Sequence, residues 1–212
     1  MTSTWTLPAT LSPPLGDREA ILDALYRVIN AFDHDDEDLL SSAFTEDSKF
    51  ILSGFVMDGL AAIRKDCFDR ISKLNTTHFV TNTRINIDEG GTTAKLSANA
   101  LAQHYRTGTG LAEAGEASRY LAASFYMLDL VKQGNGLWKI TEFNMKVAWG
   151  EGDSDIDYAV EHGAERSSGV SKDQLVLQSD YIDTGMPTSK HTMEKRCEET
   201  PGTGACDGQQ EG

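Results

Sequence analysis

Hydrophobic residues recur at helical spacing near the start of the chain. Ile21, Leu25 and Phe32 share one stripe with Leu22, Val28 and Ile29, which predicts an amphipathic helix. Asp17 is the expected N-cap, and the helix is expected to end near Asp33, where an acidic run begins. Similar but shorter patterns predict a second helix over residues 39–44 and a third over residues 59–74.

Alternating patterns predict strands over residues 49–56, 79–87, 92–105, 117–131 and 137–149. Phe79, Ile85 and Ile87 fall on one side of their strand, opposite His78, Val80 and Asn82. Between residues 94 and 104 the even positions are alanine, leucine and His104, so we expect that face to be buried. The last strand is expected to place one set of residues on a common face: Leu137, Thr141, Phe143, Met145, Val147 and Trp149.

Helices that precede a run of antiparallel strands indicate an α+β domain in which the helices cover one face of a sheet. A strongly curved sheet would form a cone with a pocket at its open end, and the small Ala98, Ala100 and Ala102 would leave room there. The pattern is confined to residues 17–162. Residues 1–16 are expected to form an arm, and residues 163–212, which lack Phe and Trp, a disordered tail.

Composition narrows the classes of function. Thirty-three acidic residues against 19 basic ones give a net charge of -14, which argues against binding nucleic acid or an anionic membrane. No apolar run reaches the length of a membrane span, and the N-terminus is a poor signal peptide. Three cysteines do not make a disulfide framework, and the sequence has neither a metal-type cysteine or histidine cluster nor a glycine-rich phosphate loop. A reducing, cytoplasmic compartment is therefore expected.

Three residues are candidates for acid–base chemistry. His104 falls on the expected buried face of its strand, His78 opens the preceding strand, and Asp33 ends the first helix against the helix dipole. A carboxylate that binds one imidazole nitrogen fixes the tautomer and makes the other nitrogen a better base. We therefore expect Asp33 to orient His104 as the base and His78 to supply the acid.

Three segments make the chain similar to a known family. FDHDDEDLLSSAFTEDSKF resembles the opening of SnoaL-like proteins of the nuclear-transport-factor-2-like superfamily. THFVTNTRINID, a histidine near the end of the next strand, and GLWKITEFNMKVAWGEGDSDIDY resemble scytalone dehydratase and its relatives. The resemblance implies a cone-shaped α+β barrel, a hydrophobic pocket, and syn elimination of water without a metal or organic cofactor. It also implies a homo-oligomer, a dimer or trimer, and assigns the catalytic positions to Asp33, His78 and His104.

The sequence departs from this family at the substrate pocket. Two tyrosines that activate the substrate carbonyl in the family correspond to Phe32 and Leu52, which cannot donate a hydrogen bond. The pocket asparagine corresponds to Ser124 or Phe125, and Tyr126 or Asn144 are candidate replacements for the carbonyl clamp. Trp149 and Tyr158 are the remaining candidates for substrate contact, the latter in a segment, 156–158, expected to act as a lid.

The leading hypothesis is a lyase or isomerase that acts on a small hydrophobic oxygenated ring compound, a polyketide or terpenoid intermediate of secondary metabolism. One alternative keeps the pocket but catalyses cyclisation or cycloaddition, because missing tyrosines leave a drier site. The other is a non-catalytic ligand-binding or assembly module, since a fold does not imply an activity.

Overall fold

The computed structural model describes residues 5–111, 118–153, 155 and 156. These residues lie in a compact unit that spans Met1–Arg166. The expected tail at 163–212 and the expected lid residue Tyr158 lie outside the described residues.

Helix α1 (Asp17–His34) begins after Gly16, whose backbone N–H donates to the Glu19 side chain three residues on. Gly16 is therefore the N-cap in place of the expected Asp17. The Asp17 carboxylate instead accepts hydrogen bonds from Lys132 Nζ at 2.6 Å and Trp138 Nε1 at 3.0 Å, which connect the start of α1 to the sheet. Helix α2 (Glu37–Ala43) follows, capped by the Asp36 side chain.

The residues predicted as one strand over 49–56 belong to two. Strand β1 (Phe44–Leu52) turns back into β2 (Phe55–Asp58) through Ser53 and Gly54. Both turn residues have positive φ, 46° and 97°, as a tight hairpin turn requires. The predicted third helix is present as α3 (Leu60–Ile63), a π-helical turn η1 (Arg64–Phe68) and α4 (Asp69–Ile71).

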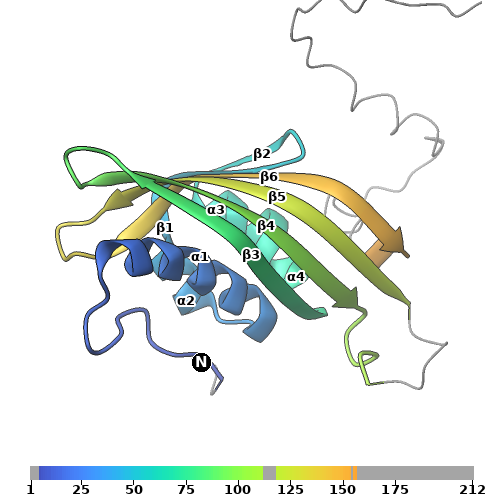
Figure 1. Cartoon of the computed structure of the whole chain (residues 1–212). Coiled ribbons are helices and arrows are strands. Elements are labelled where there is room, and N and C mark those ends of the chain that lie inside the picture. The colour runs from blue at the N-terminus through green and yellow to red at the C-terminus, as the bar shows by residue number, and fades with distance from the viewer. Residues whose placement is uncertain (1–4, 112–117, 154, 157–212) are drawn as a thin grey trace, which may run out of the picture. The chain divides into compact units, whose positions relative to one another are not determined.

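The remaining strands are β3 (Asn75–Ile87), β4 (Thr93–Tyr105), β5 (Arg119–Lys132) and β6 (Trp138–Gly152). Together they form one six-stranded sheet in the order β2-β1-β6-β5-β4-β3. All neighbours are antiparallel except β1 and β6, which are parallel. The sheet curves and the helices gather on one side of it (Figure 1). The expected α+β class and curved sheet are confirmed.

Side chains alternate between the inner and outer faces of the sheet, and bulges in β3 and β6 interrupt this alternation. In β3 an extra residue between Thr81 and Arg84, with Asn82 at φ 53°, reverses the alternation. His78, Val80, Ile85 and Ile87 therefore share the inner face, and Phe79 points outward with 60% of its surface exposed. The prediction that Phe79 shares a face with Ile85 and Ile87 was wrong for this reason.

Strand β6 carries an extra residue at Thr141 and another at Ala148. Trp138 and Ile140 are fully buried in place of the expected Leu137 and Thr141. Phe143, Met145 and Val147 keep the predicted inward face. The expected burial of the even positions of β4, from Ala94 to His104, is confirmed.

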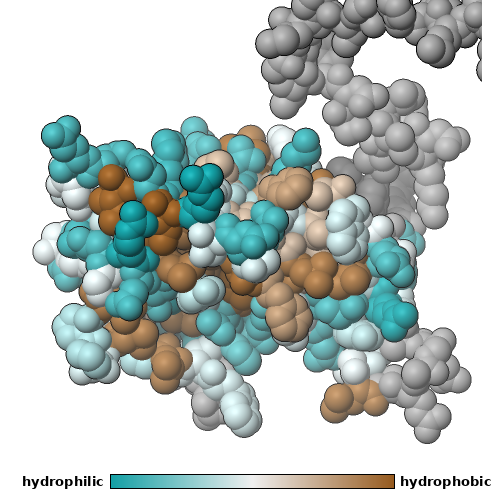
Figure 2. Space-filling view, in the orientation of Figure 1, coloured by the Kyte–Doolittle hydropathy of each residue, from teal (hydrophilic) through white to brown (hydrophobic). Residues whose placement is uncertain are grey.

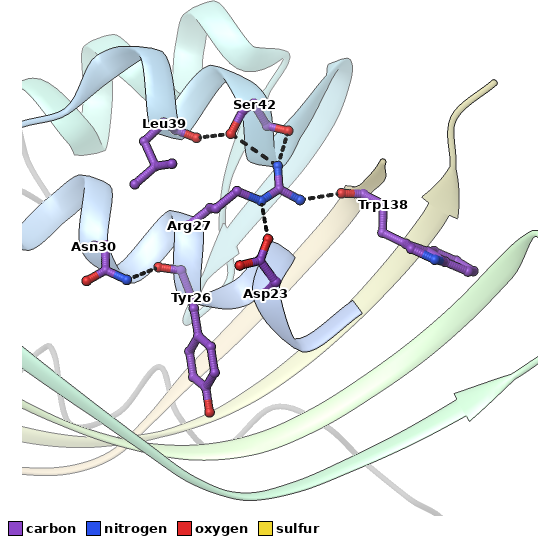
Figure 3. Close-up of polar contacts among 7 residues, drawn as sticks. All are labelled: Asp23, Tyr26, Arg27, Asn30, Leu39, Ser42 and Trp138. Carbon is purple, nitrogen blue, oxygen red and sulfur yellow. Dashed lines mark hydrogen bonds and ion pairs between the residues drawn. The ribbon is translucent and has the colours of Figure 1, made fainter. Parts of the chain in front are cut away.

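A buried arginine joins the helices to the sheet. Arg27 is 3% exposed and binds Asp23 on its own helix, at 2.9 Å, and the Ser42 carbonyl of α2, at 2.5 Å. Its other terminal nitrogen donates to the Trp138 carbonyl at 2.6 Å (Figure 3). Arg27 is thus a buried charge whose partners come from three elements. Patches of hydrophobic surface also lie outside the core, among hydrophilic side chains (Figure 2). No helix among the described residues is long and apolar enough to cross a membrane.

Candidate active site

An aspartate and a histidine meet where α1 passes the edge strand β3. Asp33 Oδ1 lies 2.7 Å from His78 Nδ1, and Asp33 Oδ2 accepts the backbone N–H of His78 at 2.9 Å. The two side chains are only 12% and 9% exposed. The backbone hydrogen bond is available because β3 ends the sheet, so one side of this strand has no neighbouring strand.

The Asp33 carboxylate accepts a third hydrogen bond, from a threonine hydroxyl. Thr76, two residues before His78 on the same face of β3, donates its hydroxyl to Asp33 Oδ1 at 2.7 Å. Burial by itself would raise the pKa of Asp33, but the hydrogen bonds from His78 and Thr76 and the charge of the imidazole hold that pKa below its usual value. Asp33 is therefore a carboxylate at neutral pH, and His78 donates its Nδ1–H to it.

The last turn of α1, which carries Asp33, is also held by contacts between Asp35 and the residues just before β3. Asp35 caps the helix in the left-handed conformation. Its carboxylate accepts hydrogen bonds from the Ser72 hydroxyl at 2.7 Å and from Lys73 Nζ at 2.5 Å. These contacts join the end of α1 to the chain just before β3, so the elements that carry Asp33 and His78 are held together twice.

The second histidine lies on the neighbouring strand. His104, on the inner face of β4, is 4% exposed, and its ring centroid lies 5.6 Å from that of His78 at an interplanar angle of 87°. Asp33 was expected to orient His104, but in the structure the Asp33 carboxylate lies against His78. The reason is the direction of α1, whose last turn meets β3 rather than β4.

Both histidines line a pocket between the helices and the inner face of the sheet. Its volume, including the open mouth, is about 680 Å³. Apart from the two imidazoles the wall is mostly apolar, and Ala102 and Ala122 provide small side chains beside His104. Ser124 and Tyr126, whose side chains carry hydroxyl groups, are also among the lining residues. Such a pocket suits a compact hydrophobic molecule with a few oxygen atoms.

Four of the predicted substrate-contact residues line this pocket: Phe32, Leu52, Ser124 and Tyr126. Asn144 and Trp149 do not line it. Asn144 is exposed on the outer face, paired with Met127 and Ile51. Trp149 follows the extra residue at Ala148, which turns it outward with 51% exposure. Sequence reasoning missed Thr76, although a threonine two positions before a strand histidine was a usable signal.

Among the described residues, no group of three or more His, Cys, Asp and Glu side chains is arranged to hold a metal ion. The chemistry that this arrangement offers is proton transfer. One imidazole has its Nδ1 held by a carboxylate, a second lies beside it, and mostly apolar side chains line the pocket around both.

Comparisons with known proteins agree with this fold. The family model of the SnoaL-like domain matches residues 13–144. The "Terrestric acid biosynthesis cluster protein E" of Penicillium crustosum is 48% identical over 148 residues, covering 69% of this chain and 93% of that protein.

Two solved structures have similar folds. The Kfla4162 protein of Kribbella flavida has a TM-score of 0.57 at 21% identity, over 68% of this chain and 97% of its own. A candidate scytalone dehydratase of Novosphingobium aromaticivorans has a TM-score of 0.54 at 21% identity, over 64% and 86%. At this identity the structural likeness concerns the fold alone.

Proposed function

The chain belongs to the SnoaL-like family, and we propose that it is a lyase that removes water from a small hydrophobic ring compound by histidine acid–base catalysis. The observation that carries this proposal is the His78 imidazole, which faces an apolar pocket with its Nδ1 bound to the Asp33 carboxylate. An imidazole held in this way has one defined tautomer, and its other nitrogen is left to exchange a proton with the substrate.

His78 is the proposed base. With Nδ1–H donated to Asp33, the lone pair of the neutral ring lies on Nε2, the nitrogen opposite the carboxylate. When Nε2 takes a proton, the positive charge forms beside the buried carboxylate and is stabilised by it. This assignment exchanges the roles that the sequence alone suggested for His78 and His104.

His104 is the proposed acid. Its ring lies 5.6 Å from that of His78 and projects from the adjacent strand on the same face of the sheet. Two proton-transfer groups at this separation, on one side of a bound ring, can serve neighbouring carbon atoms of that ring. The arrangement favours loss of hydrogen and hydroxyl from the same face.

The proposed step balances without an external oxidant or reductant. His78 Nε2 takes a proton from the carbon next to a carbonyl group, and the electrons of that C–H bond form a C=C bond. The C–O bond to the hydroxyl on the next carbon breaks, and the hydroxyl leaves as water with a proton from protonated His104. A proton moves from His78 to His104 through solvent before the next turnover.

The substrate class follows from the pocket and from one relative. Apolar walls with hydroxyl groups at Ser124 and Tyr126 suit a ring compound that carries few oxygen atoms. The Penicillium relative is named for a biosynthesis cluster, which supports an intermediate of secondary metabolism, such as a polyketide, as the substrate of this chain.

The mass of the product tests the reaction type. We expect the protein, incubated with a panel of cyclic β-hydroxy ketones, to give a product lighter by one water. A product of unchanged mass would contradict dehydration and favour isomerisation or cyclisation. One observation favours cyclisation as the second candidate: Phe32 and Leu52, which line the pocket, carry no hydrogen-bond donor that could polarise a carbonyl group.

A non-catalytic ligand-binding module is the remaining alternative. Histidine resonances in an NMR titration separate it from an enzyme. We expect the signals of His78 and His104 to respond to pH and to a bound ring ketone. If neither signal responds, the histidines are structural and the catalytic proposal fails. The cytoplasmic location and the homo-oligomer remain predictions.

A further inference from the structure

A tyrosine that the proposed reaction does not use packs against His104. Tyr120 of β5 is the direct cross-strand partner of His104 of β4. Their ring centroids are 6.3 Å apart and their planes differ by 28°, so the rings are stacked. The His104 imidazole therefore has the ring of His78 on one side, nearly perpendicular to it, and the ring of Tyr120 on another, nearly parallel to it.

The absence of a side chain at Gly150 of β6 leaves space for the Tyr120 side chain. Gly150 pairs with Ala122, the next residue after Tyr120 on the inner face of β5. A Cβ atom on Gly150 would overlap the Tyr120 hydroxyl oxygen, and it would lie 2.5 Å from Tyr120 Cζ and 2.8 Å from Cε2. Nonbonded carbon atoms pack at about 3.5–4.0 Å, so the tyrosine ring occupies the space that any other residue at 150 would fill.

The register shows where this ring lies relative to the pocket. His78, Ala102, Ala122 and Gly150 form one row across β3, β4, β5 and β6. Between His78 and Gly150 the row contains only alanine, and both alanines line the pocket. The end of the Tyr120 side chain lies against Gly150, at the β6 end of this row, and its ring stacks on that of His104. The tyrosine and the proposed base therefore lie at opposite ends of the same row of small residues.

We propose that Tyr120 is a positioning residue for His104, and that Gly150 is required because it lets the tyrosine ring reach its place. An imidazole on a strand can rotate about its Cβ–Cγ bond, which would turn its ring nitrogens away from the substrate. The stacked phenol ring limits that rotation. The inference rests on the proposed function, in which His104 supplies a proton, but its structural part can be tested without a substrate.

The test compares three single variants of Tyr120 and Gly150 with the double variant that combines Tyr120→Leu and Gly150→Ala. Tyr120→Leu removes the ring, Tyr120→Phe keeps it without the hydroxyl, and Gly150→Ala displaces it. Tyr105→Leu is the matched control, because Tyr105 adjoins His104 in sequence but points to the other face of β4. The first measurement is the ¹³C–¹H spectrum of the histidine rings, in which an aromatic ring stacked on His104 shifts its signals. His104→Gln assigns those signals.

We expect Tyr120→Leu and Gly150→Ala to move the His104 signals, and Tyr120→Phe and Tyr105→Leu to leave them nearly in place. We expect Gly150→Ala to have no further effect in the Tyr120→Leu background, since the two changes act through one ring. In turnover, Tyr120→Leu and Gly150→Ala should lower kcat by about 10- to 100-fold at nearly constant KM, because small misplacements of a reacting group are costly.

Three results would overturn the proposal. One is unmoved His104 signals in both Tyr120→Leu and Gly150→Ala. Another is a Tyr120→Phe variant as impaired as Tyr120→Leu, which would assign the role to the hydroxyl. The third is additive effects of the two changes. If His104→Gln leaves turnover unchanged, the proposed acid role of His104 fails instead, and the histidine signals still decide whether the Tyr120 ring lies against that of His104.

Discussion

Asp33 binds His78 twice, through the imidazole Nδ1 at 2.7 Å and through the backbone N–H at 2.9 Å. A side chain that rotated away from the aspartate would lose the first contact only, so the backbone contact keeps the carboxylate in place. The pair also joins the last turn of α1 to the edge strand of the sheet. The position of the proposed base is therefore set by the packing of the helix on the sheet.

The first prediction concerns Asp33→Asn. An amide NH₂ group at this place can donate to Nδ1, which favours the tautomer with the proton on Nε2 and removes the base. We expect kcat to fall by about 10²- to 10⁴-fold, the usual contribution of a general base. Asp35→Asn is the control, since Asp35 lies on the same helix end but binds Ser72 and Lys73. Equal activity of Asp33→Asn and wild type would contradict the role of the carboxylate.

The second prediction concerns stability against pH. The folded-state pKa of Asp33 is held below the unfolded value, so its stabilising effect is fully present above the unfolded pKa of about 3.9. That effect is lost as the pH falls through the folded-state pKa. We expect wild type to exceed Asp33→Asn in free energy of unfolding at neutral pH, and the difference to shrink at lower pH. Urea unfolding at several pH values measures it, and a pH-independent difference would contradict the prediction.

The third prediction concerns Thr76→Val. This change removes one hydrogen bond to the Asp33 carboxylate and leaves the strand intact, because valine suits β-structure. We expect the pKa of Asp33 to rise and stability at neutral pH to fall by about 1.5–3 kcal/mol, the range for hydrogen bonds to charged groups. Thr77→Val, on the opposite and exposed face of β3, is the matched control. Equal free energies of unfolding for Thr76→Val and Thr77→Val would show that the hydrogen bond from Thr76 to Asp33 does not stabilise the fold.

The fourth prediction concerns assembly. Phe79, Leu101, Ala123 and Trp149 form an apolar row across β3, β4, β5 and β6 on the outer face of the sheet. Phe79 and Trp149 are 60% and 51% exposed. We expect a second copy of the chain to cover this row, so that light scattering gives the mass of a homo-oligomer. Trp149→Glu should lower that mass, and Phe55→Glu, at an exposed aromatic on β2, should not. A monomeric wild type would contradict the prediction.

The helices and the order of the elements, apart from the β1–β2 hairpin, were predictable because their apolar residues repeat without interruption. The stripe of α1 and the even face of β4 are both observed as expected. The inner faces of β3 and β6 were only partly predictable, since one extra residue in a strand exchanges its two faces. Asn82 gives little sign of its left-handed backbone, and Thr141 and Ala148 give none of their bulges.

For the candidate site, the sequence indicated which residues take part but not which of them are in contact. Residue types and positions on the elements indicated Asp33, His78 and His104, but which pair binds depends on where α1 crosses the sheet. No spacing in the sequence encodes that crossing point. The outward turn of Trp149 likewise depends on the pairing of β6 with β5, where Ala148 has no partner.

Turnover of a cyclic β-hydroxy ketone by His78→Gln tests whether His78 is the base of the proposed dehydration. Glutamine keeps the side chain polar but cannot serve as the base. His34→Gln is the matched control, because His34 lies exposed at the end of α1. We expect wild type and His34→Gln to release water from the substrate at equal rates, and His78→Gln to be slower by about 10²- to 10⁴-fold. Equal rates for His78→Gln and wild type would contradict this expectation.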